Sequence, residues 1–128
     1  MIDLDAAIVP GESAGGFRLG QSVAEVLAEA PKTTEKLANG FMYGFGPVLV
    51  WIERKKVTRI GLVEGYHGAI ASVRVGCPLA ALEALGTISQ DSDDNTVVDG
   101  LAGVVFDVSK ASGKKNPILV RGIYVVPL

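Results

Sequence analysis

The sequence consists of short runs of apolar residues separated by turn-forming residues. The run 48–53 (VLVWIE) is the strongest β-forming segment, and a polar turn at 54–56 separates it from the next apolar run. This spacing is typical of antiparallel strands that bury one face. The pattern predicts strands at 7–9, 17–19, 41–45, 48–53, 57–63, 71–75, 96–99, 104–108 and 117–126, with a hairpin loop at 110–116.

Two segments follow the period of a helix instead. Ser22 is a favourable N-cap with a glutamate three residues later, and Pro31 ends the segment, which predicts a helix over 23–30. A second helix is expected over 79–85, because Pro78 suits a first helical turn. Short helices beside antiparallel strands, without alternating strands and helices, indicate an α+β fold. We expect one curved antiparallel sheet, or two abutting sheets, with a helix from each half on one face and the other face partly open.

The pattern also recurs at a fixed offset along the chain. Arg18 recurs as Arg74 and Gly20 as Gly76, and apolar positions recur in the same register without a gap. The apolar matches are Leu19 with Val75, Val23 with Leu79, and Val26 with Leu82. A fixed period is typical of duplicated structural units. We therefore predict a single domain, 1–128, built from two repeats at about 16–63 and 72–126 that share one core.

Composition places the chain among globular domains. Of its 128 residues, 48% are apolar and 20% are charged, which is enough apolar material for a real core. No apolar run approaches the length of a membrane span, and the acidic N-terminus lacks the basic region of a signal peptide. Cys77 is the single cysteine, so an internal disulfide is excluded. These features predict a cytoplasmic protein.

Charge is distributed unevenly, although the net charge is only −2. No lysine or arginine occurs between Arg74 and Lys110, and six acidic residues lie in this interval. They are Glu83, Asp91, Asp93, Asp94, Asp99 and Asp107. The basic stretches, such as 54–56, are short and have no interleaved aromatic residues, so neither nucleic acid nor a membrane is the expected partner.

The residues needed for most catalysis are missing. His67 is the only histidine and Cys77 the only cysteine, which excludes metal sites that need pairs of these residues. A Cys77–His67 pair is conceivable, but a small apolar role for Cys77 is favoured. The loop 91–95 resembles a calcium loop only faintly, since the central glycine and distal glutamate are missing. We expect no cofactor, no metal and no enzymatic activity.

A binding surface is the remaining prediction. Side chains alternate faces along a strand, so 48, 50 and 52 point one way and 49, 51 and 53 the other. Either Trp51 and Glu53 face outward, or Trp51 faces the core. A surface tryptophan beside acidic residues is a typical hot-spot composition. The predicted partner-binding residues are Tyr43, Trp51, Glu53, Tyr66, Asp91, Asp93, Asp94, Asp99 and Asp107.

The segment 19–26 (LGQSVAEV) resembles the helix entry of tandem-repeat inhibitor proteins typified by the β-lactamase inhibitor protein. The strand–helix–meander unit, given twice, also resembles small immunity proteins that protect bacteria from their own toxins. The second copy, 75–82, departs from the motif at Pro78 and Ala81, and the inhibitor family's disulfides have no counterpart. The resemblance implies a protein that works by blocking another protein, and it transfers no binding residue.

Three functions are therefore considered. The first is an immunity or inhibitor protein whose acidic half suits a basic partner, such as a nuclease toxin. The second is a small ligand-binding or enzymatic domain that uses the concave sheet face with Tyr43, His67 or Cys77. The third is an assembly module of a larger complex. The first is preferred, because no catalytic group of residues is evident.

Overall fold

The computed structural model describes residues 1–109 and 118–128, and this part of the chain is mostly β-structure. Its elements in chain order are β1 (Ser13–Ala14), β2 (Phe17–Arg18), α1 (Val23–Val26), β3 (Thr33–Leu37), β4 (Gly40–Phe45), β5 (Val48–Glu53), β6 (Lys56–Leu62), the 3₁₀ helix η1 (Leu79–Ala84), β7 (Ile88–Gln90), β8 (Thr96–Val98), β9 (Val104–Val108) and β10 (Val120–Val125).

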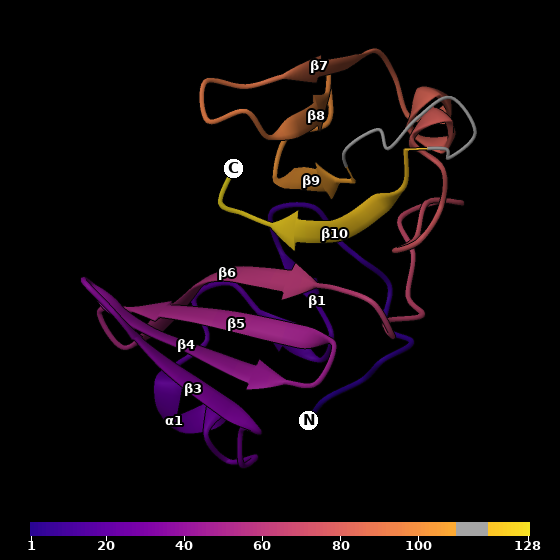
Figure 1. Cartoon of the computed structure of the whole chain (residues 1–128). Coiled ribbons are helices and arrows are strands. Elements are labelled where there is room, and N and C mark those ends of the chain that lie inside the picture. Colours follow the sequence, from indigo (N-terminus) through magenta and orange to yellow (C-terminus); the bar gives the residue numbers. More distant parts are fainter. Residues whose placement is uncertain (110–117) are drawn as a thin grey trace.

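Eight strands form one antiparallel sheet. Their order is β3-β4-β5-β6-β10-β9-β8-β7, so each half of the chain contributes a four-stranded meander. Figure 1 shows this order from β7 at the top to β3 at the bottom. β1 and β2 form a separate two-stranded hairpin.

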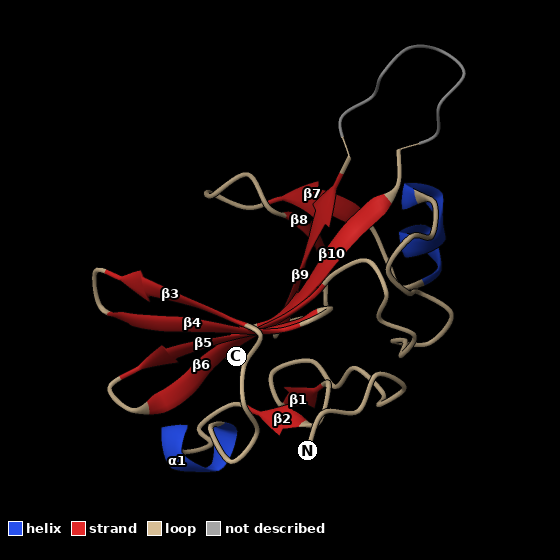
Figure 2. Cartoon of the chain, turned by 60° about the horizontal axis from the view of Figure 1, so that its bottom comes forward, coloured by secondary structure: helices blue, strands red, loops and turns tan. Residues whose placement is uncertain are grey.

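Alternation along the strands decides which side chains are buried. In β5, Val48, Val50 and Ile52 are at most 3% exposed, whereas Trp51 is half-buried and Glu53 is exposed. The N-terminal segment with β1 and β2 lies beside the buried face, together with α1 (Figure 2). We call the opposite face, which carries Leu49, Trp51 and Glu53, the outer face. One core therefore lies between the sheet and the segments packed on its inner face.

The two halves make equivalent backbone hydrogen bonds. In the first half the Gly20 amide donates to the Val57 carbonyl (2.8 Å), and in the second the Gly76 amide donates to the Val120 carbonyl (2.7 Å). The Val57 amide also donates to the Gln21 carbonyl, as the Val120 amide does to the Cys77 carbonyl in the second half. The Val23 amide donates to the Lys55 carbonyl, as the Leu79 amide does to the Ile118 carbonyl. Each short helix is thus attached to the last strand of its own half.

β6 and β10, the last strands of the two halves, pair with each other at the centre of the sheet. Gly61 lies opposite Tyr124, between the Ile60–Val125 and Leu62–Ile123 pairs. This pairing joins the two four-stranded meanders into one sheet. The boundaries of the two sequence repeats remain a prediction.

The predicted α+β class is wrong, because the helices are too short to form a layer on the sheet. The helix expected over 23–30 is α1, which has four residues, and the one expected over 79–85 is a six-residue 3₁₀ helix. Each buries only one residue, Val26 and Leu82 respectively. Helices this short gain little from their own hydrogen bonds and depend on tertiary contacts. Within residues 1–109 and 118–128, neither helix has the length and apolar sequence of a membrane-spanning segment.

The cap of α1 forms only in part as expected. The Ser22 side chain accepts the Glu25 amide at 3.3 Å, with Ser22 in extended conformation. The Glu25 carboxylate does not complete the box; it accepts from the side chains of Gln21 (3.3 Å) and Arg18 (3.5 Å). The helix therefore has one side-chain cap at its start, and no basic residue in its last turn.

Several predicted strands are also corrected. The segments 7–9 and 71–75 form only isolated bridges, Val9 with Ser13 and Ile70 with Val73. The two outermost strands, β3 and β7, were not predicted, and their residues are mostly polar or exposed. The expected hairpin loop at 110–116 and the first residue of the strand 117–126 lie outside the described residues.

Candidate functional site

Three side chains from the two halves meet at the centre of the outer face. The Arg59 guanidinium lies 4.6 Å from the centre of the Tyr124 ring and 5.4 Å from that of the Trp51 ring. The two rings meet edge to face, with centroids 5.9 Å apart. A cation over aromatic faces is attracted by their quadrupoles. We call Trp51, Arg59 and Tyr124 the aromatic–arginine cluster; all three side chains are half-buried.

The backbone places these side chains together. Trp51 pairs with Arg59 between β5 and β6, and Gly61, two residues further, pairs with Tyr124 of β10. A Cβ atom on Gly61 would lie 2.8 Å from both the Trp51 and the Tyr124 rings. The missing side chain of Gly61 is therefore the space in which the two rings approach each other.

The polar groups of the cluster are only partly paired by hydrogen bonds. The Arg59 Nε is shielded from solvent and has no hydrogen-bond partner among the described residues. Nearby, the Arg121 guanidinium donates to the Asp107 carboxylate at 3.3 Å. Burial raises the pKa of Tyr124, the Asp107 charge adds to this, and Arg59 and Arg121 oppose it. The phenol therefore stays neutral near pH 7 and is available as a hydrogen-bond donor.

Four of the predicted partner-binding residues belong to the outer face. Trp51 is at its centre, and Glu53 follows at the exposed end of β5. Asp107 lies opposite Gly122 in the sheet, half-buried, and pairs with Arg121. Asp99 follows β8, is exposed, and accepts the Ser89 hydroxyl at 2.8 Å. The structure thus brings one aromatic and three acidic predicted residues to one surface.

Asp91 instead holds its own loop together. Its carboxylate accepts the amides of Asp93 (2.9 Å) and Asn95 (3.0 Å) and the Asn95 side chain (3.4 Å). These bonds, the Asn95 amide first, hold the pKa of Asp91 below its ordinary value, and Arg59 adds to the effect. Asp93 and Asp94 remain exposed at the tip. Among the described residues, no three His, Cys, Asp or Glu side chains are placed to hold a metal ion.

Tyr43 and Tyr66 are buried and do not belong to the outer face, which corrects the surface position expected for both. Tyr43 faces the core and is 9% exposed, because it occupies the same face as Val50 in the register of β4 and β5. Tyr66 is 3% exposed; its hydroxyl accepts the Gly15 amide (2.9 Å) and donates to the Ala6 carbonyl (2.5 Å). Tyr66 therefore fixes the N-terminal segment through these two hydrogen bonds.

The buried Tyr66 hydroxyl predicts a loss of stability at alkaline pH. Burial raises the pKa of Tyr66 above its ordinary value of 10.0. The unfolded state then loses the proton first, so the contribution is complete below about pH 10 and declines as the pH rises through the folded pKa. The urea midpoint should fall from about pH 8 to about pH 11, and less steeply for Tyr66→Phe. An equal pH dependence of the urea midpoint in the wild type and in Tyr66→Phe would contradict the role given to Tyr66. The variant Tyr124→Phe measures how much of the decline comes from the raised pKa of Tyr124.

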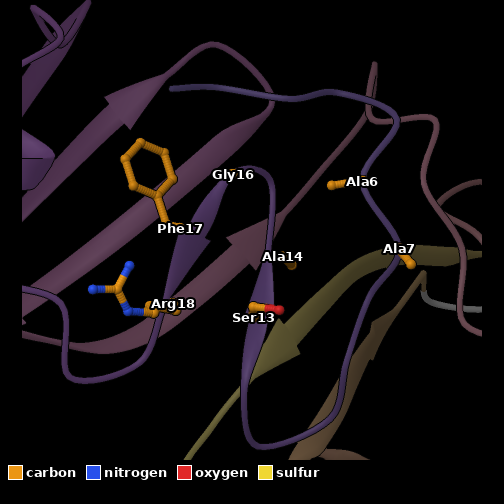
Figure 3. A pocket seen from close by; sticks show the side chains of 7 residues that line it. All are labelled: Ala6, Ala7, Ser13, Ala14, Gly16, Phe17 and Arg18. Atoms are coloured by element: carbon orange, nitrogen blue, oxygen red, sulfur yellow. The ribbon is translucent and has the colours of Figure 1, made fainter.

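Among the described residues that line the pocket beside the β1–β2 hairpin, none carries a carboxylate, imidazole or thiol. This pocket has a volume of 270 Å³, and Figure 3 shows its lining. The lining residues are Ala6, Ala7, Ser13, Ala14, Gly16, Phe17 and Arg18. Cys77 packs against the core, and His67 instead lies 3.3 Å from the Asp5 carboxylate. The conceivable Cys77–His67 pair is not among the hydrogen bonds of the described residues.

Sequence reasoning missed two members of the cluster, Arg59 and Tyr124. Tyr124 lies in the last predicted strand, and its alternation with the buried Ile123 and Val125 was a usable signal for an outward side chain. The central pairing of β6 with β10 was not predicted, and only that pairing brings Tyr124 beside Trp51.

Compared with protein-family models, curated proteins and solved structures, the chain has no match that would assign it to a family.

Proposed function

We propose that this chain binds a partner protein through the outer face of its sheet and acts by blocking that partner. The observation that supports this most is the aromatic–arginine cluster. Tryptophan, tyrosine and arginine are the residue types that dominate interface hot spots, and here one of each is packed, half-exposed, at the centre of a face.

The charges around the cluster favour a partner with a basic surface. Glu53 and Asp99 are exposed on the outer face, and Asp107 on β9 is separated from Trp51 on β5 by β6 and β10. Asp93 and Asp94 add charge at the tip of the β7–β8 loop. Rim carboxylates steer a basic partner into contact, while the buried centre supplies most of the affinity.

An immunity or inhibitor protein is the proposed biological role. It follows from the resemblance to tandem-repeat inhibitors and toxin immunity proteins, and from the scarcity of catalytic groups. The partner is then a bacterial toxin, and a nuclease fits best, since its phosphate-binding groove is basic and an acidic face would occupy it. The proposed site of action is the cytoplasm. The proposed mode of action needs no cofactor and involves binding to neither nucleic acid nor a membrane.

Binding to the product of the adjacent gene tests this proposal. Trp51→Ala and Tyr124→Ala should each weaken binding at least about tenfold in calorimetric titration, the effect of losing a hot-spot side chain. Leu27→Ala is the control, because Leu27 is an exposed apolar residue that follows α1 and does not belong to the outer face. The wild-type chain should also relieve the toxicity of that product in cells, and Trp51→Ala should not.

The acidic rim is tested in the same titration. Neutralising Asp99 and Asp107 together to asparagine should weaken binding and reduce its dependence on salt, since rim charges act mainly through association rate. Unfolding stability should change little, because exposed ion pairs contribute about 0–1 kcal/mol. Unchanged affinity in Trp51→Ala would remove the outer face from the mechanism. Unchanged salt dependence in the double asparagine variant would remove only its acidic rim.

A further inference from the structure

A second, smaller candidate site lies at the far end of the sheet, beside α1 and on the inner side of β4. Val23, Phe41, Tyr43 and Ile52 form the apolar part of a 270 Å³ pocket. The Phe41 and Tyr43 rings are stacked with centroids 6.0 Å apart, and Phe41 is still 40% exposed. No other phenylalanine, tyrosine or tryptophan in the described residues is as exposed. An exposed aromatic residue at a pocket mouth is typical of a binding surface.

The rim of this pocket is cationic. Arg54 and Lys55 complete its lining. Lys36 pairs with Phe41 between β3 and β4, and cross-strand partners project from the same face. Among the described residues, no carboxylate lies within 4.0 Å of these three cations. Their charges are therefore free to pair with acidic groups of a ligand.

Two of these cations, Arg54 and Lys55, are held in an unfavourable backbone conformation. Glu53 and Lys56 pair across β5 and β6, so Arg54 and Lys55 form a two-residue turn with φ of 51° and 66°. Two positive φ angles define a type I′ turn, for which asparagine and glycine are the preferred residues. The Lys55 carbonyl accepts the Val23 amide at 2.9 Å, which attaches the turn to α1. Arginine and lysine thus occupy the pocket mouth although the turn favours other residues.

We infer that this pocket binds an acidic segment of a protein in which one apolar side chain is flanked by carboxylates. Its volume lies below the roughly 300–1,000 Å³ of sites for cofactors and drug-sized ligands, so it suits a single side chain. The apolar wall receives that side chain, and Arg54, Lys55 and Lys36 pair with the carboxylates on either side. This site lies on the opposite face from the aromatic–arginine cluster and does not depend on it.

Two other occupants fit less well. The acidic loop 91–95 of a second copy has the right charge but no apolar residue to enter the pocket. A single-stranded nucleic acid needs a longer basic groove with several aromatic platforms, whereas this pocket has one exposed ring and three nearby cations. The apolar wall and the cationic rim together favour the acidic peptide.

Fluorescence anisotropy with a short labelled peptide tests the inference. The probe has a central phenylalanine flanked by glutamates, and comparison peptides replace the phenylalanine with serine or the glutamates with lysine. The decisive variant is Arg54→Asn with Lys55→Gly, which removes both cations and installs the residues that the turn prefers. It should fold at least as stably as the wild type, yet bind the probe at least tenfold more weakly. Phe41→Ala should weaken binding to a similar extent.

Lys32→Gln with Arg74→Gln is the matched control, because it removes the same charge from two exposed positions that do not line the pocket. It should bind like the wild type. Equal binding by the turn variant would overturn the inference, as would equal binding of the serine peptide. An equal loss in the charge control would indicate non-specific attraction and also overturn it. Displacement of the probe by an oligothymidylate, or concentration-dependent self-association that blocks the probe, would assign the pocket to another occupant.

Discussion

Replacing Leu82 with alanine is expected to lower the free energy of unfolding by about 2–5 kcal/mol, the range for removing a fully buried leucine. Leu82 is 0% exposed and is the one buried residue of η1. The helix has no side-chain cap and only six residues, so this side chain is its main attachment to the core. The urea midpoint should fall while the slope of the transition stays unchanged.

Leu27→Ala is the matched control for that measurement. Leu27 follows α1 directly, and its side chain is 42% exposed. A leucine at a surface position should change stability by no more than about 0.5 kcal/mol. If Leu82→Ala were as mild as Leu27→Ala, η1 would not be anchored through this residue.

Replacing Gly61 with alanine should destabilise the protein by about 1–3 kcal/mol, because a Cβ atom would overpack the outer face. That atom would lie 2.8 Å from both the Trp51 and Tyr124 rings, closer than real Cβ contacts allow. Gly61 has no positive φ, so the effect would come from crowding and not from backbone strain. The same change should weaken partner binding at least about tenfold, since it separates two hot-spot rings.

A double-mutant cycle separates crowding from other causes. Trp51→Ala removes one of the two rings that the new methyl group meets, so Gly61→Ala should cost less in that background than in the wild type. The measurement is the urea midpoint of the two single variants and the double variant. Strictly additive losses would mean that the Gly61 methyl group does not act through Trp51.

The inner-face pattern of the strands could be read from the sequence because it is local. Val48, Val50 and Ile52 alternate with Leu49, Trp51 and Glu53, and the structure buries the first set and leaves the second half-buried or exposed. Whether Trp51 faced the core or outward remained open, since alternation fixes which residues share a face but not which face is covered.

The fold class could not be derived from helix signals. Ser22 does cap α1, but a cap and an apolar face do not extend a helix whose remaining residues have no surface to pack against. The segment after Val26 instead continues toward β3, which is paired with β4 although its residues are mostly exposed. Partner strands, and not the local sequence, made β3 and β7 part of the sheet.

The candidate site likewise depends partly on the local sequence and partly on the tertiary structure. The sequence by itself determined the strands β4, β5, β6, β8, β9 and β10 and the acidic character of the second half, because these depend on neighbouring residues. Only the tertiary structure joined β6 to β10, and with that pairing placed Tyr124 of the second half against Trp51 and Arg59 of the first. The physical reason is that Arg59 and Tyr124 are 65 positions apart in the sequence, and no local pattern specifies which distant strand will complete a sheet.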